Sequence, residues 1–376
     1  MSNELMVITK KKRNLFIKIL LIIFISITIF ILTAILSFYF FFENKLNKIN
    51  YVVINPTEIN INEGANKNIS EYRNIVLLGI DAREYTYNGS RSDGIMIISI
   101  NKNTNDVKIT SIYRDTYLDI KNNNSSKSYL DKITHAYAYG GAKLSINSLN
   151  RNLDLNITEF VAVNFSAVVE AVNAVGGVNI HVDSSEVKYI NRYIDGIIKN
   201  TGVSSSHITK PGNYTLDGVQ ALAYCRIRYT DGGDYKRTER MREVLIATFE
   251  KAKSLGASDL NRLADIILPH VSTNINKNEI YATIPKIFNY NVIQSTGFPY
   301  DVKDTLIGGV WYAVPVNLEA DVSRLHYELF GVENYVASDI VKEISNMYNW
   351  GRFLIVFSGM FSGTLQKNSK NFLLFF

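Results

Sequence analysis

Residues 74–83 read Asn-Ile-Val-Leu-Leu-Gly-Ile-Asp-Ala-Arg, and two further apolar stretches follow closely. Arg-Ser-Asp-Gly (91–94) leads into Ile-Met-Ile-Ile-Ser-Ile (95–100), and Ile-Thr-Ser-Ile-Tyr-Arg-Asp-Thr occupies 109–116. Short β-branched runs that are bounded by Gly and Asp are typical of buried strands. We therefore predict three strands of one sheet here, each adjoined by a polar cluster.

The polar residues beside these strands combine aspartates with arginines. They are Asp81 with Arg83, Arg91 with Asp93, and Arg114 with Asp115. In a buried sheet, the ends of the strands are where side chains reach solvent and ligands. A turn or a surface salt bridge would explain one such pair. Three in succession favour a phosphate-handling site, with carboxylates for a metal and arginines for phosphate.

Composition limits the class of protein. The 376 residues allow one or two domains, and 47% hydrophobic residues are ample for a core. The formal net charge is +5, but residues 1–18 hold five basic residues and one acidic residue, so the rest is close to neutral. A near-neutral body removes the electrostatic support for nucleic-acid binding. The single cysteine, Cys225, excludes an intramolecular disulfide and a multi-cysteine metal site.

Residues 19–42 carry no charge and are rich in Ile, Leu and Phe. A helix needs roughly 20 apolar residues to cross a bilayer, whereas a signal peptide has a shorter apolar core, about 7–15 residues, and a small-residue cleavage site. We therefore predict a transmembrane helix. The basic residues before it place the N-terminus in the cytoplasm. Residues 43–376 are then expected outside the cell, as the body of a single-pass membrane protein.

Strands that alternate with helices predict an α/β domain, in which a central mixed sheet is flanked by helices. The further elements expected up to residue 224 are helices at 134–153, 165–175 and 218–224, and strands at 160–164 and 178–182. Gly176-Gly177 ends the second helix. Residues 184–215 are expected to form a long polar insertion beside a binding groove, since connections of this length are uncommon unless they are functional or disordered.

Five arginines lie close together in the next segment: Arg226, Arg228, Arg237, Arg240 and Arg242. The first two are expected on one face of an extended segment. The third and fourth are three residues apart and are expected on one face of a helix over 237–252. The fifth is expected on the solvated face of that helix, with Glu239 and Glu243 as partners.

Beyond residue 255 the pattern is weaker. The sequence predicts two short helices at 260–268 and 279–288, an aromatic strand at 310–316 and a helix near 338–347. Residues 351–376 are apolar and have no periodicity from which a structure can be predicted.

Several motifs in one order resemble the LytR–CpsA–Psr family of membrane-anchored enzymes of Gram-positive cell envelopes. Besides the strand-end motifs, these are Lys132-Ile-Thr-His-Ala-Tyr-Ala-Tyr-Gly-Gly141, Val175-Gly-Gly-Val178, the segment 216–228 and Arg237-Thr-Glu-Arg240. The resemblance is strong over residues 70–255 and weaker to residue 347. It implies a phosphotransferase that moves a glycopolymer from a polyprenyl-pyrophosphate carrier to peptidoglycan. The polymer would be a teichoic acid, a capsule or another secondary wall polysaccharide.

The resemblance also implies roles for individual residues. Asp81 and Asp93 would hold Mg²⁺ (or Mn²⁺) and, with Arg83 and Arg114, would be catalytic. The implied pyrophosphate-binding residues are Arg91, Lys132, Arg226, Arg228, Arg237 and Arg240. For His135, which lies in one of the motifs, we favour a structural role in its helix. The chemistry agrees, because phosphoryl transfer requires mainly positioning and neutralisation of charge.

With this resemblance the chain divides into six segments. These are a cytoplasmic basic tail (1–18), the transmembrane helix (19–42), a stalk with a lead-in strand (43–73), the catalytic domain (74–255), a C-terminal extension (256–350) and a tail (351–376). Three features depart from the family. Tyr113 replaces a common proline, Met241 replaces a common glutamine, and the tail after Trp350 has no counterpart.

Other function classes stay open. A protein that binds lipid-linked polymer without turnover would have the same basic cleft. A transcription attenuator is a further alternative, but a body with a net charge near +1 and no recognisable DNA-binding motif disfavours direct DNA binding. A polyprenyl-pyrophosphate pyrophosphatase would use the same residues with water as the acceptor. The expected partners are the lipid-linked glycopolymer, peptidoglycan and the membrane, and nucleic acid is not expected.

Overall fold

The computed structural model describes residues 2–65, 69–81, 89–121 and 129–348. The chain divides into two compact units, Met1–Ile49 and Asn50–Phe376. Arg83, Trp350 and the tail 351–376 lie outside the described residues.

The first unit is essentially one helix, α1 (Ser2–Leu46). Its part Leu21–Leu46 is long and apolar enough to cross a membrane, with a mean hydropathy of 2.8. The large apolar side chains from Leu21 to Phe41 are exposed, as those of a lipid-facing helix would be, whereas Leu46 is buried. This agrees with the transmembrane helix predicted at 19–42, although the helix continues to Leu46, within the segment assigned to the stalk.

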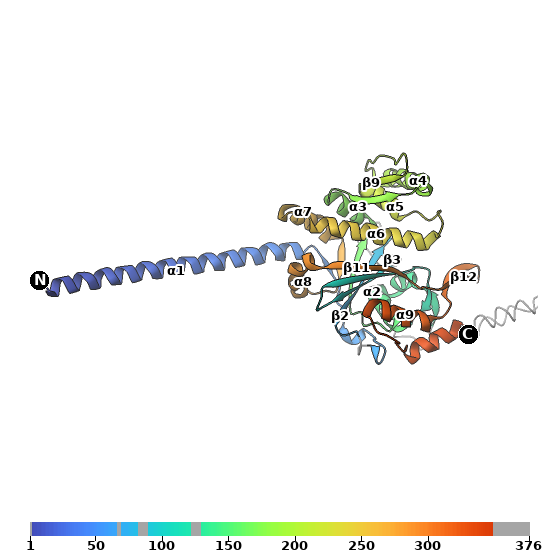
Figure 1. Ribbon diagram of the computed structural model, residues 1–376, viewed down its shortest axis with the longest axis horizontal. Helices are drawn as coiled ribbons and strands as arrows, with labels where there is room; N and C mark the ends of the chain where they lie inside the picture. Colours follow the sequence, from blue (N-terminus) through green and yellow to red (C-terminus); the bar gives the residue numbers. More distant parts are fainter. Residues whose placement is uncertain (1, 66–68, 82–88, 122–128, 349–376) are drawn as a thin grey trace, which may run out of the picture. The chain divides into compact units, whose positions relative to one another are not determined.

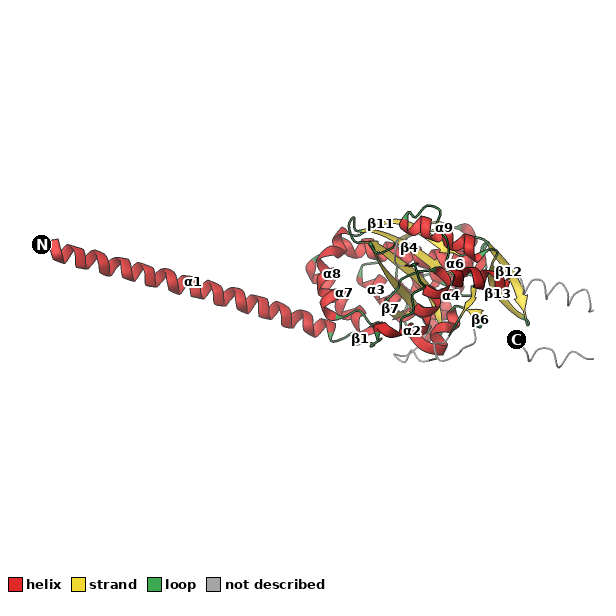
Figure 2. Ribbon diagram, turned by 90° about the horizontal axis from the view of Figure 1, so that it is seen from below, coloured by secondary structure: helices red, strands yellow, loops and turns green. Residues whose placement is uncertain are grey.

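A seven-stranded mixed sheet forms the centre of the second unit, in the order β1-β10-β7-β2-β3-β4-β11. The strands are β1 (Asn50–Tyr51), β2 (Tyr72–Ile80), β3 (Ser92–Asn101), β4 (Asp106–Ile112), β7 (Glu159–Asn164), β10 (Val271–Thr273) and β11 (Asn291–Phe298). Neighbours β2, β3 and β4 are antiparallel, whereas β7 and β11 run parallel to β2 and β4. The predicted mixed sheet, with its three consecutive strands, is confirmed. Figure 2 shows strands such as β4, β7 and β11 in yellow, among the helices in red.

Helices cover both faces of the sheet (Figure 1). On one face lie α2 (Thr134–Leu153), α9 (Leu318–Phe330) and the helix over 339–348. On the other face lie α3 (Phe165–Ala174), α5 (Gly218–Cys225), α6 (Gly233–Lys253) and α7 (Ala257–Ile267). Each layer contributes to a separate hydrophobic core with one face of the sheet, so the α/β architecture is the predicted one.

The remaining elements are helix α4, of 18 residues, and several shorter helices and strands. They are η1 (Pro56–Glu58), β5 (Tyr117–Asp119), β6 (Leu130–Lys132), β8 (Val178–Val182), α4 (Ser184–Thr201), β9 (Gly212–Leu216), η3 (Leu268–His270), α8 (Lys277–Thr283), η4 (Ile284–Asn289), β12 (Val302–Ile307) and β13 (Val310–Pro315). The pairs β5–β6, β8–β9 and β12–β13 form three two-stranded sheets.

The expectation of a long polar insertion at 184–215 is wrong. Helix α4 occupies most of it and begins with a capping box, in which Asp183 and Glu186 each accept a hydrogen bond from the other's backbone N–H. Ile190 and Ile194 are fully buried at helical spacing. The segment is an amphipathic helix. The polar residues between its buried isoleucines made it look like a loop in the sequence.

Residues 256–350 contribute more to the fold than was expected. The sequence did not indicate β10, β11 or α9, yet β10 and β11 are strands of the central sheet. Strand β11 pairs in parallel with β4, from Asn291 opposite Asp106 to Phe298 opposite Ile112. The region assigned to an extension therefore completes the sheet that carries the site.

Candidate functional site

The candidate site lies at one edge of the sheet, where β2 ends, β3 begins and β4 ends. Ile80 pairs with Ser92 across the β2–β3 ladder, and the Asp81 backbone N–H donates to the Arg91 carbonyl at 3.2 Å. Because the three strands are antiparallel neighbours, the residues that follow or precede them meet at this edge. The predicted convergence of the polar clusters is thus present in the fold.

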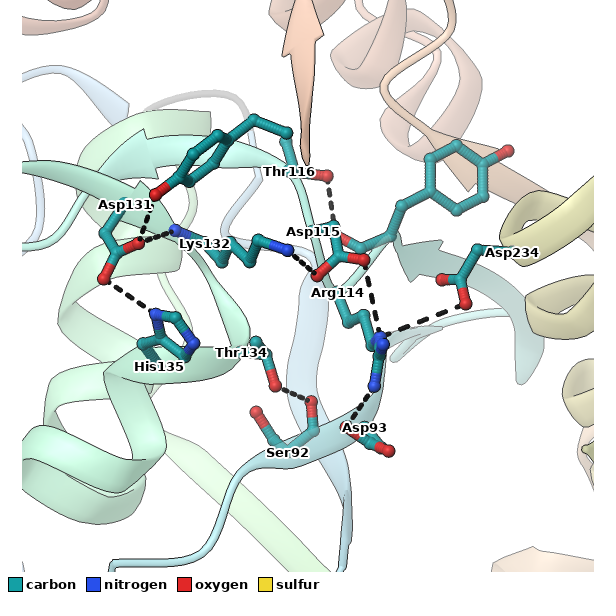
Figure 3. A network of polar contacts seen from close by, with 12 residues as sticks. Ser92, Asp93, Arg114, Asp115, Thr116, Asp131, Lys132, Thr134, His135 and Asp234 are labelled. Atoms are coloured by element: carbon teal, nitrogen blue, oxygen red, sulfur yellow. Dashed lines mark hydrogen bonds and ion pairs between the residues drawn. The ribbon is translucent and has the colours of Figure 1, made fainter. Parts of the chain in front are cut away.

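Asp93 and Arg114 form the centre of the site (Figure 3). Arg114 Nη1 donates to Asp93 Oδ1 at 2.9 Å. Its Nε lies 3.6 Å from Asp115 Oδ2 and 3.9 Å from Asp234 Oδ1. Lys132 Nζ pairs with the other oxygen of Asp115, Oδ1, at 3.0 Å. One guanidinium therefore touches three carboxylates, which come from β3, the end of β4 and α6.

Two arginines from the α5–α6 region complete this group. Arg237 is only 2% exposed, and its Nη2 donates to Asp234 Oδ2 at 3.1 Å. Arg228 Nε lies 3.8 Å from Asp234 Oδ1. Both guanidinium groups also lie 3.9 Å from Asp93 Oδ2. We call these seven residues the strand-end cluster: Asp93, Arg114, Asp115, Lys132, Arg228, Asp234 and Arg237.

The strand-end cluster holds four cations against three carboxylates. Burial alone would lower the pKa of Arg114, but the neighbouring carboxylates, led by Asp93, outweigh it and raise that pKa. For the more deeply buried Arg237, burial prevails and lowers the pKa, against the opposing charge of Asp234. The carboxylates thus hold the guanidinium groups in fixed positions while a net positive charge is left for an anion.

Arg226 does not lie where it was expected. The segment 226–228 is not a strand, because Arg226 caps the end of α5 in a helical conformation, with φ −96° and ψ −7°. Its guanidinium lies over the Phe165 ring, 5.9 Å from the centroid. Ile227 is fully buried, and only Arg228 reaches the strand-end cluster. The expected common face of Arg226 and Arg228 is therefore wrong.

Arg240 is committed to a different partner. Its Nε donates to Glu186 Oε1 at 2.7 Å, and both side chains are 2% exposed. It also donates to the Ile227 carbonyl and to Thr230 Oγ1. This buried pair ties α6 to α4, so Arg237 and Arg240 do not form the joint ligand-facing surface that their spacing suggested.

Arg242 also differs from its prediction. It is buried rather than solvated, and its Nε donates to Ser295 Oγ of β11 at 2.9 Å. Burial lowers the pKa of its guanidinium. Glu239 and Glu243, the expected partners, make their closest contacts with Lys236 and the Tyr224 hydroxyl.

One member of the cluster, Asp234, was not among the predicted site residues, whereas Asp115 belongs to the third predicted strand-end pair. Asp234 directly follows Gly232 and Gly233. Both glycines have positive φ, 84° and 49°, and this tight turn starts α6 directly beside the strand ends. A carboxylate one residue after a Gly-Gly turn, three residues before Arg237, was the available signal.

His135 lies at the second position of α2, and its Nδ1 lies 2.7 Å from Asp131 Oδ2. The same oxygen accepts from the Tyr139 hydroxyl at 3.0 Å. Burial opposes ionisation of Asp131, but these donors outweigh it and lower the pKa of the carboxyl. The contacts agree with the structural role that was favoured for His135.

Asp81 and Arg91, at the outer side of the site, are exposed. Among the described residues, no group of three or more His, Cys, Asp or Glu side chains is arranged to hold a metal. Asp81 follows β2 directly and Asp93 lies in the paired strand β3, so two carboxylates are available at this edge. This donor set fits a hard cation that takes one or two carboxylates and fills its other positions with phosphate oxygens and water.

Two apolar cavities lie on the α6 face of the sheet, and one of them adjoins the strand-end cluster. One, of about 310 Å³, is lined by Gly94 and Met96 of β3 and by Met241 of α6. The other, of about 470 Å³, extends toward Ile280 and Ile287. Both cavities are lined by the same three side chains at their junction: Leu77, Leu245 and Phe249. Because Gly94 follows Asp93, the apolar space begins where the charged site ends.

Comparison with known proteins places the chain in a family. The LytR_cpsA_psr family model matches residues 36–327. The chain is 33% identical over 245 residues to the polyisoprenyl-teichoic acid–peptidoglycan teichoic acid transferase TagT of Bacillus subtilis, a match that covers 63% of this chain and 70% of that protein.

Solved structures of similar proteins agree. TagT bound to LI-WTA matches with a TM-score of 0.55 at 28% identity, over 73% of this chain and 96% of that one. TagT with bound octaprenyl pyrophosphate lipid matches with a TM-score of 0.51 at 28% identity, over 71% and 93% of the two chains. With its motifs, its fold and these matches, the chain belongs to the LytR–CpsA–Psr family.

Proposed function

We propose that this chain is a membrane-anchored phosphotransferase, which moves a glycopolymer from a polyprenyl-pyrophosphate carrier to peptidoglycan with the help of Mg²⁺ or Mn²⁺. One observation carries the proposal: an apolar cavity meets a cluster of fixed arginines at Asp93-Gly94. A lipid pyrophosphate has the same two parts in the same order. The similar protein TagT is a teichoic acid transferase and has been solved with octaprenyl pyrophosphate bound, so a teichoic acid is the polymer we propose first.

The carrier lipid would occupy the two connected cavities. Their walls are aliphatic and aromatic side chains of β2, β3, α6 and α7. Each square ångström of apolar surface removed from water contributes about 25 cal/mol, so an isoprenoid chain gains affinity along the whole cavity. The pyrophosphate would then lie on Arg114, Arg228 and Arg237, whose forked guanidinium groups suit neighbouring phosphate oxygens.

The same edge of the sheet offers carboxylate ligands for the metal. Asp81 and Asp93 would hold it, with phosphate oxygens as further ligands. When bound, Mg²⁺ supplies positive charge that stabilises the charge on the phosphate oxygens. Asp93 also contacts Arg114, so one carboxylate would couple the metal to the arginines.

The transfer itself requires positioning and neutralisation. A hydroxyl of the acceptor attacks the phosphorus that carries the polymer and forms a new O–P bond, while the bond from this phosphorus to the lipid-phosphate oxygen breaks. The proton of the hydroxyl is released to solvent. The lipid phosphate leaves with additional negative charge. Arg114 and Arg237 would stabilise that charge, and Asp115 and Asp234 would keep both guanidinium groups oriented.

The orientation in the membrane is part of the proposal. Basic residues precede the apolar part of α1, and this favours a cytoplasmic N-terminus. The unit Asn50–Phe376 would then lie outside, on the side of peptidoglycan. Protease added to intact protoplasts should digest this unit, whereas complete protection would contradict the orientation.

A transfer assay tests the function. The full chain in detergent is incubated with lipid-linked teichoic acid and un-crosslinked peptidoglycan oligomers, and attachment of polymer to the oligomers is measured. Hydrogen bonds to charged groups contribute roughly 1.5–3 kcal/mol, so Arg114→Ala or Arg237→Ala should lower the rate by about tenfold or more. Arg114→Lys should recover only part, because lysine lacks the fork.

Matched controls make the assay specific. Arg262 is an exposed arginine of α7 with an Asp partner three residues away, so Arg262→Ala should keep the wild-type rate. Substitution of both Asp81 and Asp93 by Ala should abolish the dependence on Mg²⁺. Release of phosphate without polymer attachment would instead support a pyrophosphatase, and binding without either product would support a non-catalytic protein.

A further inference from the structure

A third cavity, of about 380 Å³, lies beside the strand-end cluster and has a different lining from the two apolar ones. Three elements meet there: the end of β4, the start of α6 and the hairpin β12–β13. Its walls carry four aromatic rings and three carboxylates. The aromatic residues are Tyr113, Tyr235, Trp311 and Tyr312. The proposed donor does not use this space.

The third cavity adjoins the strand-end cluster, because the two share lining residues. Asp115 and Asp234 belong both to the strand-end cluster and to this cavity. The first apolar cavity is instead joined to the cluster through Gly94, next to Asp93. The cluster therefore adjoins an apolar space at Gly94 and a polar, aromatic space at Asp115 and Asp234.

This arrangement suits the two substrates of a phosphoryl transfer. The attacking oxygen and the leaving oxygen lie roughly in line on opposite sides of the phosphorus. If the lipid leaves toward the apolar cavities, the acceptor hydroxyl must approach from the opposite side. The third cavity borders the cluster at Asp115 and Asp234, away from Gly94, and so offers a separate approach to the arginines.

The lining has the chemistry of a sugar-binding site. A pyranose ring presents C–H groups on its faces, which pack on aromatic rings, and hydroxyls at its edge, which donate to carboxylates. Trp311 is 63% exposed at this cavity, although a large aromatic side chain usually gains by burial. Asp304 accepts from the Tyr235 hydroxyl at 2.7 Å and so is held at the wall.

The surrounding side chains also hold the rings in place. Tyr113 and Tyr235 pack edge to face, with centroids 4.5 Å apart. The Lys132 ammonium lies 5.4 Å from the centroid of the Tyr312 ring. A second phosphate is disfavoured there, since Asp115, Asp234 and Asp304 would repel it. An uncharged polar ring fits the lining better than an anion or an isoprenoid chain does.

We propose that the third cavity binds a sugar ring of the peptidoglycan acceptor, with Trp311 stacked on the face of that ring. This rests on the proposed function, because it names the place from which the acceptor hydroxyl reaches the phosphorus. Trp311 is a specificity residue for the acceptor and takes no part in binding the lipid pyrophosphate.

Steady-state kinetics with the full chain test the assignment. Trp311→Ala should raise KM for un-crosslinked peptidoglycan oligomers about fivefold to tenfold, while KM for the lipid-linked polymer stays unchanged. Trp311→Phe should recover part of the loss, because it keeps a flat apolar face. Leu306 pairs with Trp311 across the hairpin and is 53% exposed, but it does not line the cavity. Leu306→Ala is therefore the matched control and should behave as wild type.

A binding measurement separates the possible sources of the sugar. The chain has two tryptophans, so Trp350→Phe leaves Trp311 as the only one. Peptidoglycan oligomers should change the fluorescence of Trp311, and polyprenyl pyrophosphate without sugar should not. The proposal is overturned if the oligomers leave the fluorescence and KM unchanged. It is also overturned if Trp311→Ala weakens binding of the lipid-linked polymer but not of bare polyprenyl pyrophosphate, because the sugar would then belong to the donor.

The two proposals fail in different ways. If wild-type protein transfers no polymer but the Trp311 fluorescence of Trp350→Phe responds to peptidoglycan oligomers, the proposed function fails and the acceptor site stands. If wild-type protein transfers polymer and Trp311→Ala does so with an unchanged acceptor KM, the function stands and the acceptor site fails.

Discussion

The two faces of the central sheet are equally apolar in sequence, yet they are packed differently. On one face Val76, Leu78 and Ile80 of β2 are fully buried in a core shared with α2 and α9. On the other, Ile75 and Leu77 are half-buried and line the cavities beneath α6. Alternation along a strand creates two apolar faces, but the covering helices decide which face is closed. The closed face stabilises the fold, and the open face is available for a lipid.

On the face with the cavities, which we call the open face, the covering helix cannot be held in place by close packing alone. Helix α6, which covers it, is tied to α4 by the buried pair Arg240–Glu186. Arg240→Ala would leave a buried carboxylate without its partner, so it should cost about 3–5 kcal/mol of unfolding free energy. Urea denaturation measures this loss, with the exposed Arg262→Ala as control. A loss below about 1 kcal/mol would show that α6 is held mainly by apolar contacts.

Substitutions at two adjacent residues of β3 allow a direct comparison of the two faces. Ile97 is fully buried on the closed face, and Ile98 lines the larger cavity on the open face. Removal of a well-packed isoleucine side chain costs about 2–5 kcal/mol, so Ile97→Ala should be strongly destabilising. Ile98→Ala should cost about 1 kcal/mol or less, because the side chain already borders empty space. Equal losses in denaturant unfolding would mean that the open face is closed in solution.

Enlarged side chains should give the converse pattern. Leu77 lines both cavities at their junction, so Leu77→Trp should obstruct the passage and weaken binding of polyprenyl pyrophosphate by about tenfold or more. The fold should tolerate it, since the added atoms enter a cavity. Leu78→Trp points to the closed face and should instead lose about 1–3 kcal/mol or more of stability through overpacking. Lipid titration and urea unfolding of both variants separate the two effects.

The sequence predicts both faces but not the difference between them. The β-branched runs of β2, β3 and β4 suffice for a sheet, and the aspartates and arginines beside them suffice for a site at its edge. Whether Ile97 or Ile98 borders a cavity depends on the distance of helices that come from remote parts of the chain. The pattern of apolar residues along a strand carries no information about that distance.

The arginines of α6 show the same limit. The spacing of the arginines predicted that Arg237 and Arg240 share one face of the helix and that Arg242 lies on its solvated face. In the fold, Arg240 pairs with Glu186 of α4 and Arg242 with Ser295 of β11. Neither α4 nor β11 was predicted, so neither partner was known. Arg237 differs from both, because its partner Asp234 is local, one turn earlier on the same helix.

A smaller effect on stability is expected from a buried carboxyl group on the closed face. Asp321, in the first turn of α9, is buried, and its Oδ2 has no hydrogen-bond partner among the described residues. Burial raises its pKa from 3.8 to about 7. The folded state therefore keeps a proton that the unfolded chain releases near pH 4, and stability falls as pH rises from about 4 to about 7.

Asp321→Asn removes this dependence. One pKa unit corresponds to about 1.4 kcal/mol, and relaxation around the charge reduces the total. We therefore expect the variant to be more stable than wild type by on the order of 1–2 kcal/mol at pH 8, with little difference near pH 4. Thermal unfolding at both pH values measures the gain. A constant difference across this range would show that Asp321 does not titrate there.

The most direct test of the central claim is a titration of the full chain in detergent with octaprenyl pyrophosphate, compared with inorganic pyrophosphate. We predict that Arg114→Ala weakens the binding of both ligands. Leu77→Trp should weaken only octaprenyl pyrophosphate, by about tenfold or more. Undiminished binding of octaprenyl pyrophosphate by Leu77→Trp would contradict the claim, since the lipid chain would then lie outside the cavities that join the strand-end cluster.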